Sequence, residues 1–174
     1  MRVPFIAAWA KPSESNVHQK ALSIPHGAIQ SQVAAVHELL PTIADIVGLD
    51  VPDNHKVDGS SLVRLLSGKS DASRDEQFLM HYPHAPHRSD YFTCYRDGDW
   101  KVIYHYHPSE ASEGSHYQLY NLKQDPFEST NLAKAEPTQL RKMMQLLTAQ
   151  LSDHEALYPL SSEDANQPLA PQLP

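Results

Sequence analysis

YFTCYRDGDWKVIYHYH, residues 91–107, is the stretch that decides the fold, because turn chemistry and residue pattern agree there. Asp97-Gly98 lies between two runs of aromatic and β-branched residues, which is typical of a β-hairpin with a two-residue type I′ turn. That turn predicts a register in which Tyr95 faces Trp100 and Cys94 faces Lys101. Alternate side chains share one face of a strand. We expect one face of the hairpin to lie in the core, with Tyr91, Thr93, Tyr95, Trp100, Val102 and Tyr104.

The segments around the hairpin predict an α+β fold. FLMHYPH at 78–84 and HYQLYNL at 116–122 read as strands, which with the hairpin give a small four-stranded antiparallel sheet. Residues 137–151 form an amphipathic pattern whose apolar positions have helical spacing, namely Leu140, Met143, Met144, Leu147 and Leu151. Such a stripe is far more often core than a cofactor-binding motif. We therefore expect this C-terminal amphipathic helix to pack on one face of the sheet.

The chain before and after this unit has a different character. VPFIAAW at 3–9 is an apolar run typical of a buried strand, and residues 36–47 place apolar side chains on one helical stripe that Gly48 ends. A serine then caps a second short helix, LVRLL, which ends at Gly68. We expect three parts: residues 1–70, residues 71–158, and a Pro-rich tail at 159–174. The composition of the tail is typical of disorder, yet we expect it to be held against another surface.

Composition excludes several classes of function. The chain of 174 residues has a formal net charge of −7 and no basic stripe, which argues against binding to nucleic acid or to an anionic membrane. No segment approaches the roughly 20 apolar residues that a membrane-spanning helix needs, and the N-terminus lacks the pattern of a signal peptide. Cys94 is the single cysteine, so no internal disulfide forms, and we expect a buried structural thiol.

Eleven histidines make a metal site worth testing. His81, His84 and His87 lie in HYPHAPH, where two prolines exclude a regular helix. His105 and His107 are two apart on a strand, a spacing that zinc sites use. No second pair of ligands with matching spacing is visible in the sequence, so we expect exposed histidines at a strand end and no metal site. The sequence also lacks a Gly-rich phosphate loop, a nucleophile elbow and His-Glu-x-x-His.

Five blocks of the sequence, taken in order, resemble the C-terminal third of a type I, formylglycine-dependent sulfatase of the alkaline phosphatase superfamily. They are RVPFIAAW (2–9), ELLPTIADIVGL (38–49), DGSSLVRLLSG (58–68), RDGDWKVIY (96–104) and LYNLKQDPFESTNLA (119–133). The resemblance implies that residues 1–70 are the C-terminal remnant of the large sulfatase α/β domain. It also implies that residues 71–158 are the sulfatase C-terminal subdomain.

The chain departs from this family where the chemistry lies. Sulfatases convert a cysteine or serine in C-x-P-S-R to formylglycine beside a calcium ion, whereas here Cys94 is followed by Tyr-Arg-Asp. The aspartate ligands of the family have no counterpart in this sequence. Glu38 stands where many members have aspartate, which we interpret as a conservative structural change. The resemblance therefore implies no catalytic residue and no metal ligand in this chain, with calcium and formylglycine expected in an N-terminal part that precedes it.

The resemblance implies a C-terminal fragment, inactive alone, of an enzyme that hydrolyses the sulfate esters of a carbohydrate. Loops of this subdomain often line the substrate pocket, so His81 and His84 are the candidates for substrate binding; the other interpretation places them at a subdomain interface. The alternative function is a non-catalytic interaction module derived from a sulfatase, which binds a sulfated ligand or a partner chain. Phosphomonoesterases and phosphonate hydrolases of the superfamily usually lack these C-terminal blocks.

Two further expectations follow. Relatives of this kind are commonly periplasmic or secreted, although we find no targeting signal in this sequence. The apolar strand expected at 3–9 would leave backbone groups unpaired, so we expect the chain to self-associate through that strand or through the tail.

Overall fold

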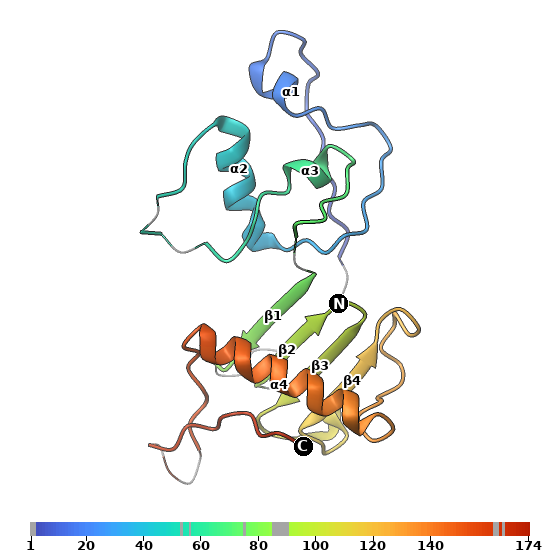
Figure 1. Ribbon diagram of the computed structural model, residues 1–174, viewed down its shortest axis with the longest axis vertical. Coiled ribbons are helices and arrows are strands. Elements are labelled where there is room, and N and C mark those ends of the chain that lie inside the picture. The colour runs from blue at the N-terminus through green and yellow to red at the C-terminus, as the bar shows by residue number, and fades with distance from the viewer. Residues whose placement is uncertain are drawn as a thin grey trace. The chain divides into compact units, whose positions relative to one another are not determined.

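The structure, a computed structural model, describes residues 3–52, 54–55, 57–74, 76–84, 91–161, 164 and 166–174. The chain divides into two compact units, Met1–Asp75 (unit 1) and Glu76–Pro174 (unit 2). Figure 1 labels the helices and strands of each unit. The division at residues 70, 158 and 174 that the sequence predicts stays a prediction.

Unit 1 consists of short helices joined by long connections. The helices are α1 (Val17–Ala21), the 3-10 helix η1 (Val36–Glu38), α2 (Leu39–Val47) and α3 (Val63–Leu66). Gly48 ends α2 with φ 71°, in the left-handed region that glycine adopts without steric cost, so the predicted C-terminal stop is confirmed. The N-cap residue of α3 is Leu62, which makes no side-chain capping bond, so the predicted serine cap is wrong; Ser61, one residue earlier, accepts from the N–H of Val63 at 3.2 Å through its Oγ.

The apolar stripe of η1 and α2 is exposed. Val36, Leu40 and Ile43 have relative exposures of 81%, 53% and 58%. The side that α2 buries is polar, since the Thr42 hydroxyl donates to Glu38 O at 2.6 Å and accepts from the N–H of Leu62 at 2.8 Å. An amphipathic helix ordinarily turns its apolar side toward a core. In α2 that side is left available for packing.

Residues 3–9 form no strand, so the buried strand predicted there is wrong. Val3, Phe5 and Ile6 are exposed, and Trp9 Nε1 donates to Leu22 O at 2.9 Å. A strand exists only where its backbone N–H and C=O groups pair with a neighbouring strand. Among the described residues of unit 1 there is no sheet that offers this pairing.

Unit 2 is built on the predicted four-stranded antiparallel sheet, and the structure shows that its strand order is β1-β2-β3-β4 (Figure 1). The strands are β1 (Gln77–Tyr82), β2 (Phe92–Asp97), β3 (Trp100–His105) and β4 (Tyr117–Asn121). A short 3-10 helix, η2 (Glu110–Ser112), lies in the connection between β3 and β4.

The hairpin has the predicted core face but a different register. Tyr95 faces Val102 and Cys94 faces Ile103, so the pairings of Tyr95 with Trp100 and of Cys94 with Lys101 are wrong. The reason is the turn: Asp97, predicted as a turn residue, pairs with Trp100, and the two turn residues are Gly98, at φ 55°, and Asp99, which has a negative φ. Glycine at the first central position is typical of a type II′ turn. The register moves by two residues, and each side chain therefore keeps its predicted face.

Replacing Gly98 by alanine is expected to destabilise unit 2 by about 1 kcal/mol, because an L-residue is strained at positive φ. Asp99→Ala is the matched control, since it changes the neighbouring turn residue at negative φ. Thermal unfolding followed by Trp100 fluorescence in a Trp9→Phe background compares the two. Equal stability of the two variants would contradict the assigned turn.

The α-helix α4 (Pro137–Asp153) begins at Pro137 as predicted and packs on β2 and β3 (Figure 1). Its predicted apolar stripe is buried, and all five side chains contribute to one cluster with the hairpin face: Leu140, Met143, Met144, Leu147 and Leu151, with Tyr95, Val102 and Tyr104. Burying one such side chain contributes about 1.5–3 kcal/mol.

In the described part of the chain, no helix has both the length and the apolar character needed to cross a bilayer.

The described residues after α4 are held against the rest of unit 2. Leu160 and Pro168 form an antiparallel bridge, and Leu169 packs against the core cluster. Composition alone favoured disorder here, but backbone pairing and one apolar anchor give this segment a defined course.

Candidate functional site

His81, one of the two predicted substrate-binding residues, lies in β1 and uses both ring nitrogens within unit 2. Its Nε2 is 2.7 Å from Leu157 O, and because a carbonyl only accepts, Nε2 carries the proton and donates. Its Nδ1 is 2.7 Å from Thr93 Oγ1. In the neutral ring Nδ1 is the acceptor, so the hydroxyl of Thr93 donates to it.

Behind His81 the hydrogen bonds continue into the core. Thr93 Oγ1 lies 2.7 Å from the Tyr106 hydroxyl, which donates because the proton of Thr93 is directed at His81. Burial raises the pKa of Tyr106, which keeps this hydroxyl protonated. Thr93 is fully buried. The ring of His81 is thus held in one tautomer and one orientation.

His84, the second predicted residue, lies beyond the end of β1 and is exposed. Its ring meets Tyr82 edge-on at 5.3 Å between centroids, and Tyr82 in turn lies 5.9 Å from Phe92. The structure therefore gives His81 and His84 different surroundings and does not join them in one cluster. His87, which the sequence grouped with them, lies outside the described residues.

The pair His105 and His107 does not form the exposed strand end that the sequence predicted. His105 is the last residue of β3 and is buried, with Nε2 at 3.0 Å from Gln118 Oε1. His107 is exposed and meets Tyr91 edge-on at 5.2 Å. Within the described residues, no three His, Cys, Asp or Glu side chains gather in an arrangement that would hold a metal ion.

The cofactors of the predicted family do not fit the described residues. Cys94 is a buried thiol in the middle of β2, as predicted, and burial raises its pKa. The residues that follow it, Tyr95 and Arg96, do not provide C-x-P-S-R. We therefore derive no step of catalysis through formylglycine or calcium on these residues.

A polar cluster that sequence reasoning missed lies in unit 1. Glu38 and Arg74 form an ion pair at 2.6 Å, with side-chain exposures of 8% and 7%. Arg74 Nη1 also donates to Ser60 Oγ at 2.8 Å, and Ala35 N donates to Glu38 Oε2 at 2.9 Å. No motif marks this pair, because 36 residues separate its members and each looks like a surface charge in the sequence.

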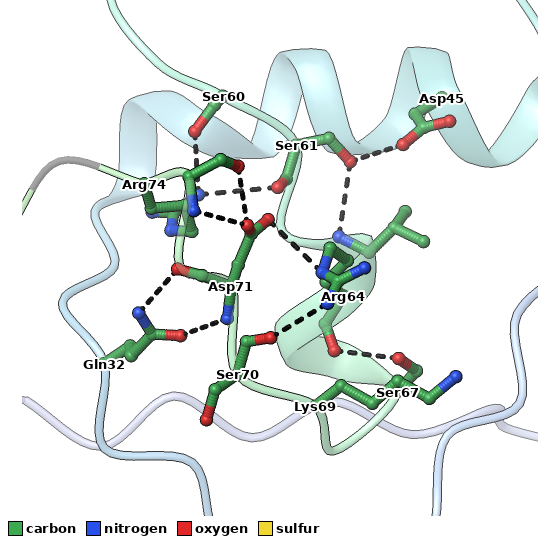
Figure 2. Close-up of polar contacts among 12 residues, drawn as sticks. Gln32, Asp45, Ser60, Ser61, Arg64, Ser67, Lys69, Ser70, Asp71 and Arg74 are labelled. Carbon is green, nitrogen blue, oxygen red and sulfur yellow. Dashed lines mark hydrogen bonds and ion pairs between the residues drawn. The ribbon is translucent and has the colours of Figure 1, made fainter.

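Neighbouring hydrogen bonds bring the same connections together, as Figure 2 shows. The Gln32 amide donates to Asp71 O at 2.9 Å and accepts from Asp71 N at 2.7 Å. Ser61 Oγ donates to Asp45 Oδ2 at 2.6 Å. The hydrogen bond of the Asp71 carboxylate with Ser73 lowers its pKa. These contacts fix loops, and nothing in the cluster supplies a nucleophile.

Each comparison with known proteins matches this chain to sulfatases. The model described as N-sulphoglucosamine sulphohydrolase, C-terminal, matches residues 1–156. Arylsulfatase A of Homo sapiens is 31% identical over 163 residues, which cover 79% of this chain and 32% of that protein. N-acetylgalactosamine-6-O-sulfatase of Bacteroides thetaiotaomicron is 26% identical over 157 residues, which cover 84% of this chain and 26% of that protein.

A solved structure supports the fold. The structure of a protein in complex with its substrate, D-glucosamine-2-N,6-O-disulfate, aligns with a TM-score of 0.51 at 25% identity, and the match covers 68% of this chain and 24% of that one. The chain thus spans about a quarter to a third of the length of these relatives.

Proposed function

The chain belongs to the N-sulphoglucosamine sulphohydrolase C-terminal family, and on that premise we propose that it is the C-terminal part of an enzyme that hydrolyses sulfate esters of a carbohydrate. By itself the chain is inactive in this proposal. It completes the enzyme by packing against a larger catalytic part and by contributing side chains near the substrate.

The exposed apolar stripe of η1 and α2 is the observation that carries this proposal. Val36, Leu40 and Ile43 are more than half exposed, although soluble proteins rarely leave such a stripe open unless another surface covers it. The relatives are about three to four times longer than the matched part. A catalytic part of that size supplies an apolar surface for α2 and for the exposed side chains of Val3, Phe5 and Ile6.

The chemistry of sulfate ester hydrolysis requires the larger part. The reaction needs an activated nucleophile, a cation beside the nonbridging oxygens and an acid for the leaving group, all around one centre. Cys94 is buried in β2, and the described residues assemble no cation site. We assign the formylglycine and the calcium ion to the larger part.

Sulfated carbohydrate is the substrate class that the relatives favour. One relative is named for N-acetylgalactosamine-6-O-sulfate and another was solved with a disulfated glucosamine. In our proposal the exposed ring of His84 contacts the substrate. Both ring nitrogens of His81 already have partners, so His81 does not contact the substrate in this proposal. It acts as a positioning residue that holds the end of β1, from which His84 follows.

Purified chain is expected to show no turnover of 4-nitrophenyl sulfate in the presence of calcium, because the three required groups are not assembled on it. Release of nitrophenolate measures the reaction. An inactive control is the same preparation after heat denaturation. Turnover that survives repurification and exceeds this control would refute the assignment of catalysis to a larger part.

Sequencing the DNA directly upstream separates the proposal from the alternative, a non-catalytic module that binds a sulfated ligand or a partner chain. An in-frame C-x-P-S-R with carboxylate ligands supports the enzyme. A stop codon or unrelated coding sequence supports the module. If the chain is such a module, calorimetry should show that the chain alone binds glucosamine disulfate but not glucosamine. If it is part of the enzyme, we expect no measurable heat of binding from either sugar.

In the full-length enzyme, His84→Ala is expected to raise KM for the sulfated sugar by roughly tenfold with kcat little changed, because one hydrogen bond to a charged group is lost. His107→Ala is the control, since His107 is also exposed and its ring contacts Tyr91. Initial rates over a range of substrate concentration give both constants. An unchanged KM in the His84 variant would remove His84 from the substrate site.

Two less specific proposals accompany this one. The parent enzyme acts in the periplasm or outside the cell, where sulfated carbohydrates are met. The isolated chain self-associates through the exposed side chains of Val3, Phe5 and Ile6 and through the α2 stripe. Light scattering that finds only monomer at high concentration would contradict self-association.

A further inference from the structure

The described residues of 157–174, here called the strap, follow α4 and return along unit 2. Their own backbone bonds form a narrow loop, in which Leu169 N donates to Pro159 O at 2.8 Å and Ser161 N donates to Gln167 O at 2.9 Å. Most of the strap is exposed. It therefore depends on a few attachment points on the sheet.

His81 makes the first attachment. Its Nε2 donates to Leu157 O at 2.7 Å, and its ring meets Tyr158 edge-on at 6.1 Å. Thr93 and Tyr106 fix the ring from behind, with consecutive hydrogen bonds of 2.7 Å. The donor that holds Leu157 is thus preorganised by buried groups.

Leu169 and Tyr117 make the other attachments. Leu169 packs against the core cluster, and the Tyr117 hydroxyl donates to Gln172 O at 3.1 Å. Burial raises the pKa of Tyr104, and the backbone of Gln172 opposes that shift, which places the strap beside a second tyrosine hydroxyl. Tyr104 and Tyr117 meet edge-on at 5.6 Å.

The composition of the strap suits this surface. It carries Pro159, Pro168, Pro171 and Pro174, and extended proline-rich peptides dock on surfaces lined by aromatic rings with hydroxyl groups that reach backbone carbonyls. The family match ends at residue 156, directly before the strap begins. The core cluster of α4 and the hairpin is made without the strap, apart from the residues packed at its margin.

We propose that the aromatic surface formed by His81, Tyr104 and Tyr117 is a binding site for a proline-rich peptide, and that the strap occupies it in cis as a separable element latched by His81. Release of the strap uncovers the surface while α4 stays packed on the sheet.

Hydrogen exchange of the full chain, read by mass spectrometry, tests the latch. In the unmodified chain the amides of Ser161 and Leu169 are protected. His81→Phe keeps a ring but removes both nitrogens, and it is expected to speed their exchange roughly tenfold while amides in the middle of α4 stay unchanged. His107→Phe is the matched control, because His107 contacts Tyr91 and not the strap.

Leu169→Ser provides a second variant that leaves the sheet and α4 intact, and it is expected to release the strap to the same degree or more. Unprotected strap amides in the unmodified chain would overturn the proposal. Unchanged exchange in both variants would do the same. Faster exchange of α4 together with the strap would also overturn it, because the strap would then be an integral part of the core.

A labelled peptide of residues 157–174 tests the binding surface itself. It is expected to bind the full chain carrying Leu169→Ser in fluorescence anisotropy. It should not bind the unmodified chain, because a tethered strap competes at an effective concentration on the order of millimolar. Absence of binding to the Leu169→Ser chain, in which exchange shows the strap released, would overturn the assigned surface.

Discussion

Arg74→Met is expected to lower the free energy of unfolding of unit 1 by about 3–5 kcal/mol, because it leaves the carboxylate of Glu38 buried without its counter-charge. Arg74 also donates to Val33 O at 3.1 Å, so the substitution frees a second connection of the unit. Urea unfolding followed by Trp9 fluorescence in a Trp100→Phe background measures unit 1, since Trp9 lies in that unit.

Arg64→Met is the matched control for this prediction. Arg64 pairs with Asp71 at 3.6 Å with its side chain 60% exposed, and exposed pairs contribute only about 0–1 kcal/mol. Joint replacement with Glu38→Leu and Arg74→Met should recover much of the lost stability, because it removes both buried charges. Equal losses of unfolding free energy in Arg74→Met and Arg64→Met would show that the buried pair contributes no more to stability than the exposed one.

Leu147→Ala is expected to destabilise unit 2 by about 3 kcal/mol, through lost apolar burial and the cavity left behind. Leu147 is completely buried in the cluster between α4 and the sheet. Thermal unfolding followed by Trp100 fluorescence in a Trp9→Phe background reports on this unit, because Trp100 packs against the same cluster.

Leu157→Ala is the control for this core substitution, since it removes the same atoms from a side chain that is 83% exposed. Its backbone carbonyl, which accepts from His81, is unchanged. We expect a change in stability within about 0.5 kcal/mol. A cost at Leu147 as small as that at Leu157 would mean that α4 is not packed on the sheet.

Alternation explains why the faces of the hairpin were predictable and its register was not. Side-chain direction repeats every two residues, so moving the register by two leaves Tyr95 and Val102 on the core face. The choice between two turns that both contain Gly98 depends on the φ of its neighbours. Type I′ and type II′ turns place that glycine at different central positions, and the sequence Asp97-Gly98-Asp99 allows both.

The candidate site was predictable only as far as local chemistry reaches. The sequence placed His81 and His84 at the end of a strand, and the structure agrees on that position. The partners of His81 are Thr93 and Leu157, which are 12 and 76 residues away. The sequence also predicted an exposed His105, because a strand end is usually solvated, but in the fold that residue is buried beside Gln118.

The sequence by itself determined the kinds of elements in this protein: four strands from alternation, α4 from its helical stripe, and the ends of α2 and α3 from Gly48 and Gly68. These properties arise within a few residues, where backbone sterics and periodicity act. Only the tertiary structure decided which groups far apart in the chain became partners, as for Glu38 with Arg74 and for His81 with Leu157. Burial and pairing depend on what packs nearby, which also explains why the apolar stripe of α2 is exposed and residues 3–9 form no strand.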